Sequence, residues 1–447
     1  MKLTRIHYCK NLNKNKLEQL KEQATLLGRV RSKVWREYGS ISGLKSRDRT
    51  IRDEWMHRGI KFNVSANAWK EILRDTMGDI KAYREAAKEK VKKAIRIRTN
   101  DKIELKRLYT LLKSDNWMQD NFLRRKMRKH FKHGVNHTFN QIIVRSDMCR
   151  TYKLNGQCWL KVPSLVSGKP INVPLNTTMA FAPTGTLRII IKDDIVEIHS
   201  TYDAPQGKPC GDKIVGVDKG FTEAFIDSDG KVYGKGLGNL ISSESDYLNK
   251  KYKARNKLYA LAKSKPHKYH KIIKNNLGRK KLNKRQTAQK AKLKTLAFTA
   301  AQRLFDKASV VVCEDLSSPV ASRYSYGKNM NRKLNSWCKG ILADSLEQVS
   351  KVRCSDLYLV NAAYTSQCDS LTDNLLLGKR VGERFYRENG DVIQSDYNAA
   401  RNVLARHNDK DITLYTPFKK VRQILQERTD SYRLATVSTK TLVKDSI

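Results

Sequence analysis

The chain has 447 residues, with 89 Lys and Arg side chains against 44 Asp and Glu, so its formal net charge is +45. A folded protein with this charge is expected to bind a polyanion, RNA or DNA, since a small acidic substrate needs no field of that size. The sequence has no apolar run of membrane-spanning length and no P-loop motif, and its eight cysteines form no CxxC pair, as is typical of reduced cytosolic thiols.

The first 150 residues are predicted to be mostly helical. Residues 1–8 alternate between apolar and polar side chains and could form a single strand. Apolar residues then recur at helical spacing in four stretches, about 16–39, 64–96, 101–113 and 116–133. His130, His133 and His137 have a spacing that could hold a metal on a helix, but the lysines and arginines around them favour a helix that faces phosphate.

From about residue 155 the pattern changes to short β-branched segments separated by Gly and Pro. Strands are predicted at 158–162 and 170–174 and as a hairpin over 187–202. We expect a small antiparallel barrel or sheet, completed by the strand at 1–8, so that the helical region is inserted after the first strand. The segment 207–212 is the expected linker out of this region.

The remaining part alternates strands and helices. An apolar strand interrupted by an acid is predicted at 213–220, and 221–233 completes a three-strand meander. Further elements follow in the order strand 308–317, helix 334–352, strand 357–360 and helix 395–406. This order, with helices between the meander and the next strand, is that of a ribonuclease-H-like fold.

The stretch 247–305 is unusually basic. It contains 19 Lys and Arg and no Asp or Glu, in a sequence compatible with helices. We therefore expect it to contact the phosphate backbone of a nucleic acid. The candidate contact residues are Lys250, Lys251, Lys253, Arg255, Arg279, Lys280, Lys281, Lys284 and Arg285.

Three acids, Asp218, Glu314 and Asp396, lie at the ends of predicted strands and at the start of the last predicted helix. An isolated acid in an apolar strand costs several kcal/mol unless something compensates its charge, and a bound cation would do so. Carboxylates suit Mg²⁺, or Mn²⁺, and two such ions ~4 Å apart support phosphodiester hydrolysis. The alternative is that each acid only caps a strand or lies in an exposed turn.

Three segments that carry these acids resemble the three RuvC motifs of the TnpB family and its descendants, the type V CRISPR effectors. They are GVDKG at 216–220, VVCEDL at 311–316 and SDYNAARNVL at 395–404. The segment AYTSQC at 363–368 resembles the one that leads into the zinc ribbon of that family. The resemblance covers about 211–407 by motif and 1–210 only in layout.

The chain departs from that family at the zinc ribbon. The family usually has two CxxC pairs between the TSQ segment and the third motif, which bind one zinc ion. Here 366–396 keeps only Cys368. Zinc is therefore not expected, and the insert must be held by packing.

The resemblance implies a multidomain α+β fold: a ribonuclease-H-like (RuvC) nuclease domain, and a small wedge β-barrel with an inserted helical recognition domain. The implied domains are 1–13, the first barrel strand; 14–150, the recognition domain; 151–210, the rest of the barrel; 211–407, the nuclease domain with inserts at 247–305 and 365–395; and 408–447, a C-terminal extension without an assigned role.

The resemblance also implies a function. The protein would be a prokaryotic cytoplasmic, nucleoid-associated RNA-guided DNA endonuclease that binds a structured guide RNA and double-stranded target DNA beside a short duplex motif, with no membrane partner. Asp218, Glu314 and Asp396 would hold two Mg²⁺ ions and cut DNA. A nuclease-silent RNA-guided repressor, an RNA-independent transposase or resolvase, and a structural RNA-binding protein remain open, as do the source of the guide and the oligomeric state.

Overall fold

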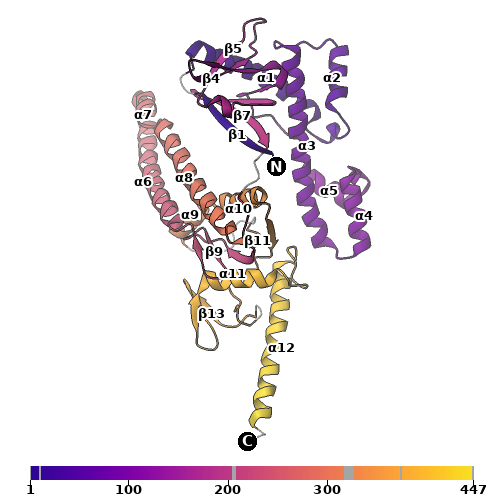
Figure 1. The fold of residues 1–447 in the computed structure, drawn as a ribbon, viewed down its shortest axis with the longest axis vertical. Helices are drawn as coiled ribbons and strands as arrows, with labels where there is room; N and C mark the ends of the chain where they lie inside the picture. Colours follow the sequence, from indigo (N-terminus) through magenta and orange to yellow (C-terminus); the bar gives the residue numbers. More distant parts are fainter. Residues whose placement is uncertain (1, 10–11, 204–207, 317–326, 373–374, 445–447) are drawn as a thin grey trace. The chain divides into compact units, whose positions relative to one another are not determined.

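The computed structural model describes residues 2–9, 12–203, 208–316, 327–372 and 375–444 (Figure 1). It divides into two compact units, Met1–Pro205 and Gln206–Ile447. The start of the predicted linker at 207–212 lies outside the described residues, as does the end of the predicted strand at 308–317. The described part of the chain is a mixture of helices and four separate β-sheets.

The described residues of unit 1 form five α-helices. They are α1 (Lys14–Tyr38), α2 (Asp48–His57), α3 (Ala66–Arg98), α4 (Lys102–Lys113) and α5 (Asn121–His130). Helix α2 was not predicted because it is short and buries only two side chains, Ile51 and Trp55. Its apolar pattern is therefore too brief to show a helical period.

His130, His133 and His137 were predicted to lie on one helix, and this prediction was wrong. Helix α5 ends at His130, and His133 and His137 belong to the loop that follows. This loop is fixed to α1 by Asn136, whose side-chain amide donates to the carbonyl oxygen of Gly28 at 3.0 Å. Among the described residues, no group of three His, Cys, Asp or Glu side chains is placed to bind one metal ion.

The strands of unit 1 form two antiparallel sheets. The first has the order β1-β7-β6-β2, with β1 at Lys2–Cys9, β2 at Gln141–Val144, β6 at Leu187–Lys192 and β7 at Ile195–Asp203. The second has the order β3-β4-β5, with β3 at Arg150–Leu154, β4 at Gln157–Val162 and β5 at Ile171–Leu175. Strand β1 pairs with β7, so the helices of this unit lie in the sequence between two strands of one sheet. Both sheets share a core with α1 and α3.

Unit 2 is built on a five-stranded sheet. Its order is β10-β9-β8-β11-β12, with β8 at Lys213–Asp218, β9 at Phe225–Asp227, β10 at Val232–Tyr233, β11 at Ala308–Glu314 and β12 at Asp356–Val360. Strands β8, β11 and β12 are parallel, and the meander β8–β10 is antiparallel. The predicted order of the strands in this central sheet, with helices before and after β11, is confirmed.

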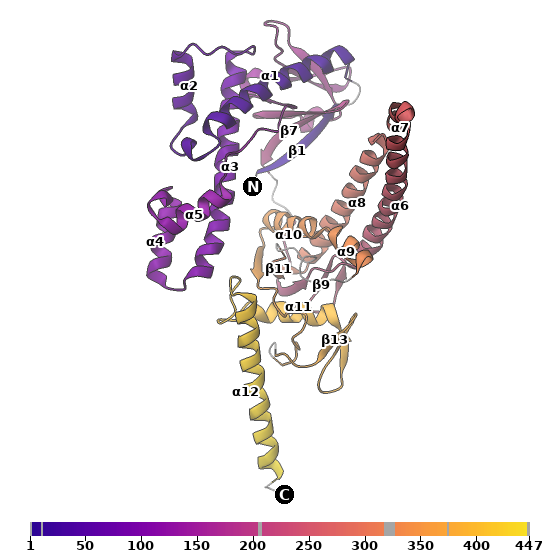
Figure 2. The same ribbon diagram turned by 180° about the vertical axis from the view of Figure 1, so that it is seen from behind.

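Seven α-helices belong to the described part of unit 2. They are α6 (Leu237–Ser264), α7 (Tyr269–Asn276), α8 (Lys280–Phe305), α9 (Lys328–Asn335), α10 (Lys339–Arg353), α11 (Ser395–Arg406) and α12 (Phe418–Lys444). Figure 2 shows α6 and α8 running side by side with α7 at their far end. The single helix predicted at 334–352 is instead split between α9 and α10. At the break, the indole of Trp337 donates to the carbonyl oxygen of Gly220 at 2.9 Å.

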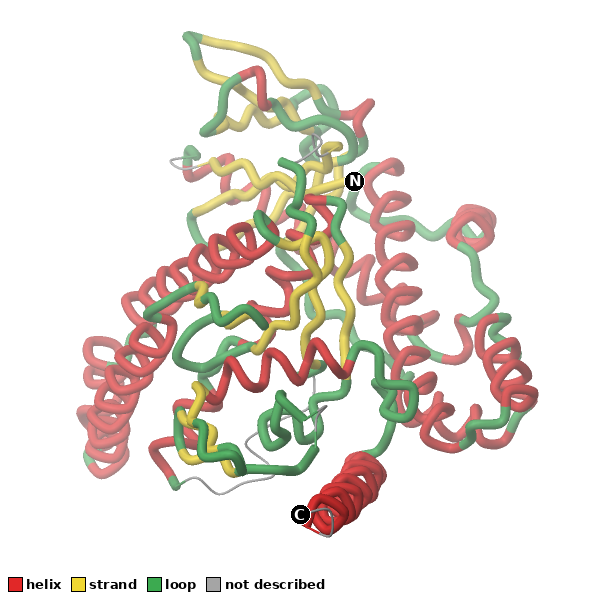
Figure 3. Tube along the Cα trace, turned by 60° about the horizontal axis from the view of Figure 1, so that its bottom comes forward, coloured by secondary structure: helices red, strands yellow, loops and turns green. Residues whose placement is uncertain are grey.

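The faces of the central sheet are covered by different helices. Val311 and Cys313 pack in the core with α8 and α10, whereas the alternate residues Val310 and Val312 pack with α11. Figure 3 shows α11 running across the strands of this sheet. The approach is close at Gly216, where a Cβ atom would lie 2.2 Å from the carbonyl oxygen of Ala400.

The insert between β12 and α11 contains a three-stranded antiparallel sheet that was not predicted, with β13 at Lys379–Val381, β14 at Arg384–Tyr386 and β15 at Val392–Gln394. Helix α12 packs beside this insert through Val421 and Leu425, which share a core with Cys368. Arg428 of α12 also binds Asp409 at 2.8 Å. None of the described helices has the length and apolarity needed to cross a bilayer.

The close approach at Gly216 gives a direct test of the fold. In Gly216→Ala, the new methyl group would push α11 away from β8, and overpacking of this kind costs about 1–3 kcal/mol. We expect faster hydrogen exchange of the α11 amides by mass spectrometry. Gly278→Ala is the matched control, since no atom lies within 4 Å of its Cβ position. Equal exchange in both variants would contradict this packing.

Candidate active site

Asp218 and Glu314 end two adjacent parallel strands. Each lies one residue beyond the paired positions Val217 and Cys313 of β8 and β11. Because side chains alternate along a strand, Asp218 lies on the same face as Gly216, the face that α11 covers. The carboxyl ends of adjacent parallel strands lie at the same edge of the sheet. The register of β8 and β11 therefore places Asp218 beside Glu314.

Asp396 completes the group from the first turn of α11. Burial raises the pKa of Asp218 well above its usual range, and the negative charges of Glu314 and Asp396 raise it further. Burial also raises the pKa of Glu314, which is 7% exposed. The structure thus brings Glu314 and Asp396 near enough to Asp218 to destabilise its charged form.

Two cationic side chains that the sequence analysis did not single out oppose this repulsion. Arg380 of β13 binds Asp396, with its Nη2 3.0 Å from Oδ1. Lys219 is buried, and its ammonium group donates to the backbone carbonyl of Glu314. Both cations counter the rise in the pKa of Asp218. Lys219 belongs to the GVDKG motif and could have been found from the sequence. Arg380 lies outside the motifs, and nothing in the sequence links it to the acids.

A fourth carboxylate, Glu223, follows β8 and was also missed. Burial raises the pKa of Glu223, and the charges of Asp396 and Glu383 raise it further. The negative field therefore extends beyond the three predicted acids. A polar residue, Thr365, also contacts the site, because its hydroxyl donates to Oε1 of Glu314.

The donor set suits a hard divalent cation. Its ligands would be carboxylate oxygens, which Mg²⁺ and Mn²⁺ prefer. The pKa of Asp218 is raised by burial and then by the neighbouring negative charges, and a bound cation would offset both effects. In the described structure the side chains do not converge on one point. Asp396 is bound by Arg380 and Glu314 by Thr365, so both side chains would have to rotate to bind one metal ion together.

The insert between β12 and α11 is held by buried polar contacts as well as by packing. Arg387, which directly follows β14, lies 3.1 Å from the carboxylate of Asp369, and both side chains are buried. Burial raises the pKa of the Cys368 thiol to about 12.

The predicted basic stretch forms the helices α6, α7 and α8. Seven of its nine candidate contact residues are exposed and have no ion pair within the described ranges: Lys250, Lys251, Lys253, Arg279, Lys280, Lys281 and Lys284. Arg255 instead donates to the carbonyl of Leu277 at 2.6 Å. Arg285 binds Glu244 at 2.6 Å and stacks on Tyr247. These two arginines are therefore engaged in holding the helices.

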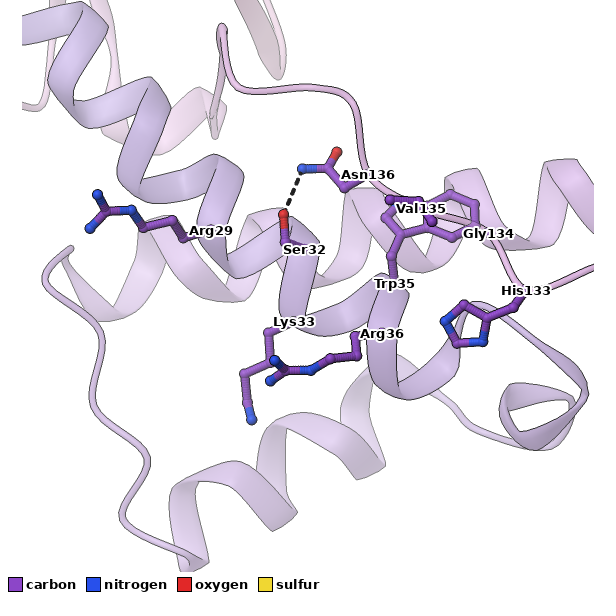
Figure 4. A pocket seen from close by; sticks show the side chains of 9 residues that line it. All are labelled: Arg29, Ser32, Lys33, Trp35, Arg36, His133, Gly134, Val135 and Asn136. Atoms are coloured by element: carbon purple, nitrogen blue, oxygen red, sulfur yellow. Dashed lines mark hydrogen bonds between the residues drawn. The ribbon is translucent and has the colours of Figure 1, made fainter.

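A second cationic surface lies in unit 1 (Figure 4). It is a pocket of about 400 Å³ lined by Arg29, Ser32, Lys33, Trp35, Arg36, His133, Gly134, Val135 and Asn136. Arg29, Lys33 and Arg36 come from successive turns of α1, and no acid is among the lining residues. The side chain of Asn136 donates to Ser32 at 3.1 Å and fixes the opposite wall. One of these cations, Lys33, is paired with Glu37 at 2.5 Å.

No family model and no curated protein matches the chain. Solved structures do match along most of its length. One is the Cas12f1–sgRNA–target DNA complex, with 13% identity and a TM-score of 0.47 over 92% of this chain and 100% of the other. Another is the mini-RNA-guided endonuclease CRISPR-Cas_phi3, with 11% identity and a TM-score of 0.47 over 91% and 92%. A third is CasPhi-2 (Cas12j) bound to crRNA and phosphorothioate-DNA, with 12% identity and a TM-score of 0.45 over 90% and 92%.

Proposed function

We propose that this protein is an RNA-guided DNA endonuclease with a RuvC-type active site. The observation that carries the proposal is the meeting of Asp218, Glu314 and Asp396 at one edge of a sheet with the element order of a ribonuclease-H-like fold. A purely RNA-binding protein has no use for two acids that destabilise the charged form of a third, Asp218, against the cost of its desolvation.

The chemistry would be phosphodiester hydrolysis. Asp218, Glu314 and Asp396 would hold two Mg²⁺ or Mn²⁺ ions, which supply an activated water and stabilise the leaving oxygen. The protein itself fixes the ligands: the strand register places Asp218 and Glu314, and α11 brings Asp396 to them. The guanidinium of Arg380 binds Asp396. If Asp396 rotates away from Arg380 to bind a metal ion, the guanidinium would be free to balance the charge of a phosphate.

The RNA-guided part of the proposal rests on the motifs at 216–220, 311–316 and 395–404 and on the charge of +45. The helices of unit 1 would form the recognition domain, and its two sheets the wedge domain. The exposed lysines of α6 and α8 would contact the backbone of the guide RNA or of its duplex with the target.

Guide RNA should copurify with the protein when it is expressed with its native flanking DNA. We expect sequencing of this RNA to yield one abundant species with a fixed structured part and a variable end. A heterogeneous mixture of cellular RNA would contradict RNA guidance and favour an unguided nuclease.

Removal of one acid tests the active site. Asp218→Ala removes a metal ligand, so we expect Mg²⁺-dependent cleavage of target DNA to become undetectable while target binding is kept. Cleavage is measured on a labelled duplex, and binding by gel shift with the same complex. The control is Glu347→Gln, which removes an exposed carboxylate of α10. Cutting by Asp218→Ala at the wild-type rate would show that the active site lies elsewhere.

The basic helices are tested through the salt dependence of RNA binding. Replacing Lys250, Lys253 and Lys284 with Gln removes three exposed charges. The slope of log K against log salt should become shallower by about 0.9 for each duplex phosphate that the protein no longer neutralises. In the control, the same change is made at Lys351, Lys419 and Lys420, which should leave the slope unchanged. Identical slopes for the two triple variants would refute the assignment.

A further inference from the structure

Thr365 is the buried hydroxyl residue at the candidate active site. It lies in the loop between β12 and β13 and is 1% exposed. Its hydroxyl donates to Oε1 of Glu314, and a second acceptor, the carbonyl oxygen of Ala362, lies 3.2 Å away. A hydroxyl has one proton to donate. The contact to Glu314 is the shorter of the two, so the Thr365 hydroxyl donates its proton to Glu314.

The loop that carries Thr365 is itself tied to α11. The side-chain amide of Asn402 donates to the carbonyl oxygens of Thr365 at 2.8 Å and Cys368 at 2.7 Å. One turn earlier, Asn398 donates to the same Cys368 carbonyl at 2.7 Å and accepts from the backbone N–H of Ser370 at 3.0 Å. Both asparagine side chains are fully buried.

These hydrogen bonds connect the helix that carries Asp396 to the side chain of Glu314. Asp396 lies in the first turn of α11, and Asn402 lies on the same helix less than two turns later. From Asn402 the chain of contacts runs through the backbone of Thr365 to its hydroxyl and on to the carboxylate of Glu314. The position of Glu314 relative to Asp396 is therefore set by buried hydrogen bonds as well as by the sheet.

We propose that Thr365 is a positioning residue that orients Glu314 for metal binding, with Asn402 holding Thr365 in place. This inference rests on the proposed function. A Glu side chain has three rotatable bonds, and a hydrogen bond to one oxygen selects the rotamer that leaves the other oxygen available as a ligand. Partners of this kind around metal ligands typically change metal affinity or activity by 10–100-fold when they are removed.

The competing explanation is that Thr365 only fills space in the core. Ser and Ala at this position differ by the hydroxyl alone, so they separate the two explanations. Thr365→Ser keeps the donor and loses the methyl group, whereas Thr365→Ala loses both. Thr365→Val keeps the shape and loses the donor, and it leaves an acceptor of Glu314 without its partner.

The test uses the full-length protein. Mn²⁺ binding to the protein alone is followed by electron paramagnetic resonance, and single-turnover cleavage by the guide RNA complex is measured across a Mg²⁺ series. In Thr365→Val and Thr365→Ala, we expect Mn²⁺ affinity to fall about 10–100-fold and half-saturating Mg²⁺ to rise by a similar factor. Thr365→Ser should stay within about threefold of wild type, because it keeps the donor.

Thr429→Val is the matched control. The hydroxyl of Thr429 is also buried in unit 2, where it donates to the Leu425 carbonyl and accepts from the N–H of Leu376. It makes no contact with the acids, so its removal should leave the metal dependence unchanged. Thermal melting of each variant shows whether a change in metal affinity is accompanied by a loss of folding.

Several outcomes would overturn the inference. Wild-type metal affinity in Thr365→Ala and Thr365→Val would show that the hydroxyl does not orient Glu314. Equal losses in Thr365→Ser and Thr365→Ala would assign the effect to the methyl group and thus to packing. Asp218→Ala is run in parallel: if it still cuts, the proposed function fails, and if it is inactive while Thr365→Ala behaves as wild type, only the positioning role fails.

Discussion

The close approach of helix α11 to strand β8 is the constraint on which the candidate site depends. It is possible because position 216 is glycine, since any Cβ there would meet the backbone of α11. The same approach brings the first turn of the helix, with Asp396, to the strand ends that carry Asp218 and Glu314. Packing and chemistry are thus coupled: the helix that covers this face of the sheet also supplies the third acid and the asparagines that fix the neighbouring loop.

The acids could be predicted because their surroundings are local in the sequence. A carboxylate at the end of a β-branched run, as at Asp218 and Glu314, is visible without any knowledge of the fold. The parallel order of the strands then follows from the helices between them. The same locality explains why the strands and most long helices were found, whereas the short helix α2 and the break at Trp337 were not.

The groups that surround the acids could not be predicted, because they reach the site through long-range contacts. Arg380 lies on a strand of three residues, too short for a periodic pattern, and its pairing with Asp396 depends on how the insert folds. Thr365 is separated by 51 residues from Glu314, its partner. Likewise, Arg255 and Arg285 looked like surface cations within a basic run, and only the folded helices show that they hold other groups.

The ion pair between Arg380 and Asp396 has a consequence for how the site responds to its ions. An arginine that already neutralises a ligand acts as a competitor for it, so part of the binding energy of an incoming cation is used to displace the guanidinium. The protein can therefore gather its acids and stay folded when ions are scarce. If the site binds a cation as proposed, it would fill only at a higher free concentration than the carboxylates alone would require, and the arginine would serve as a counter-ion until that concentration is reached.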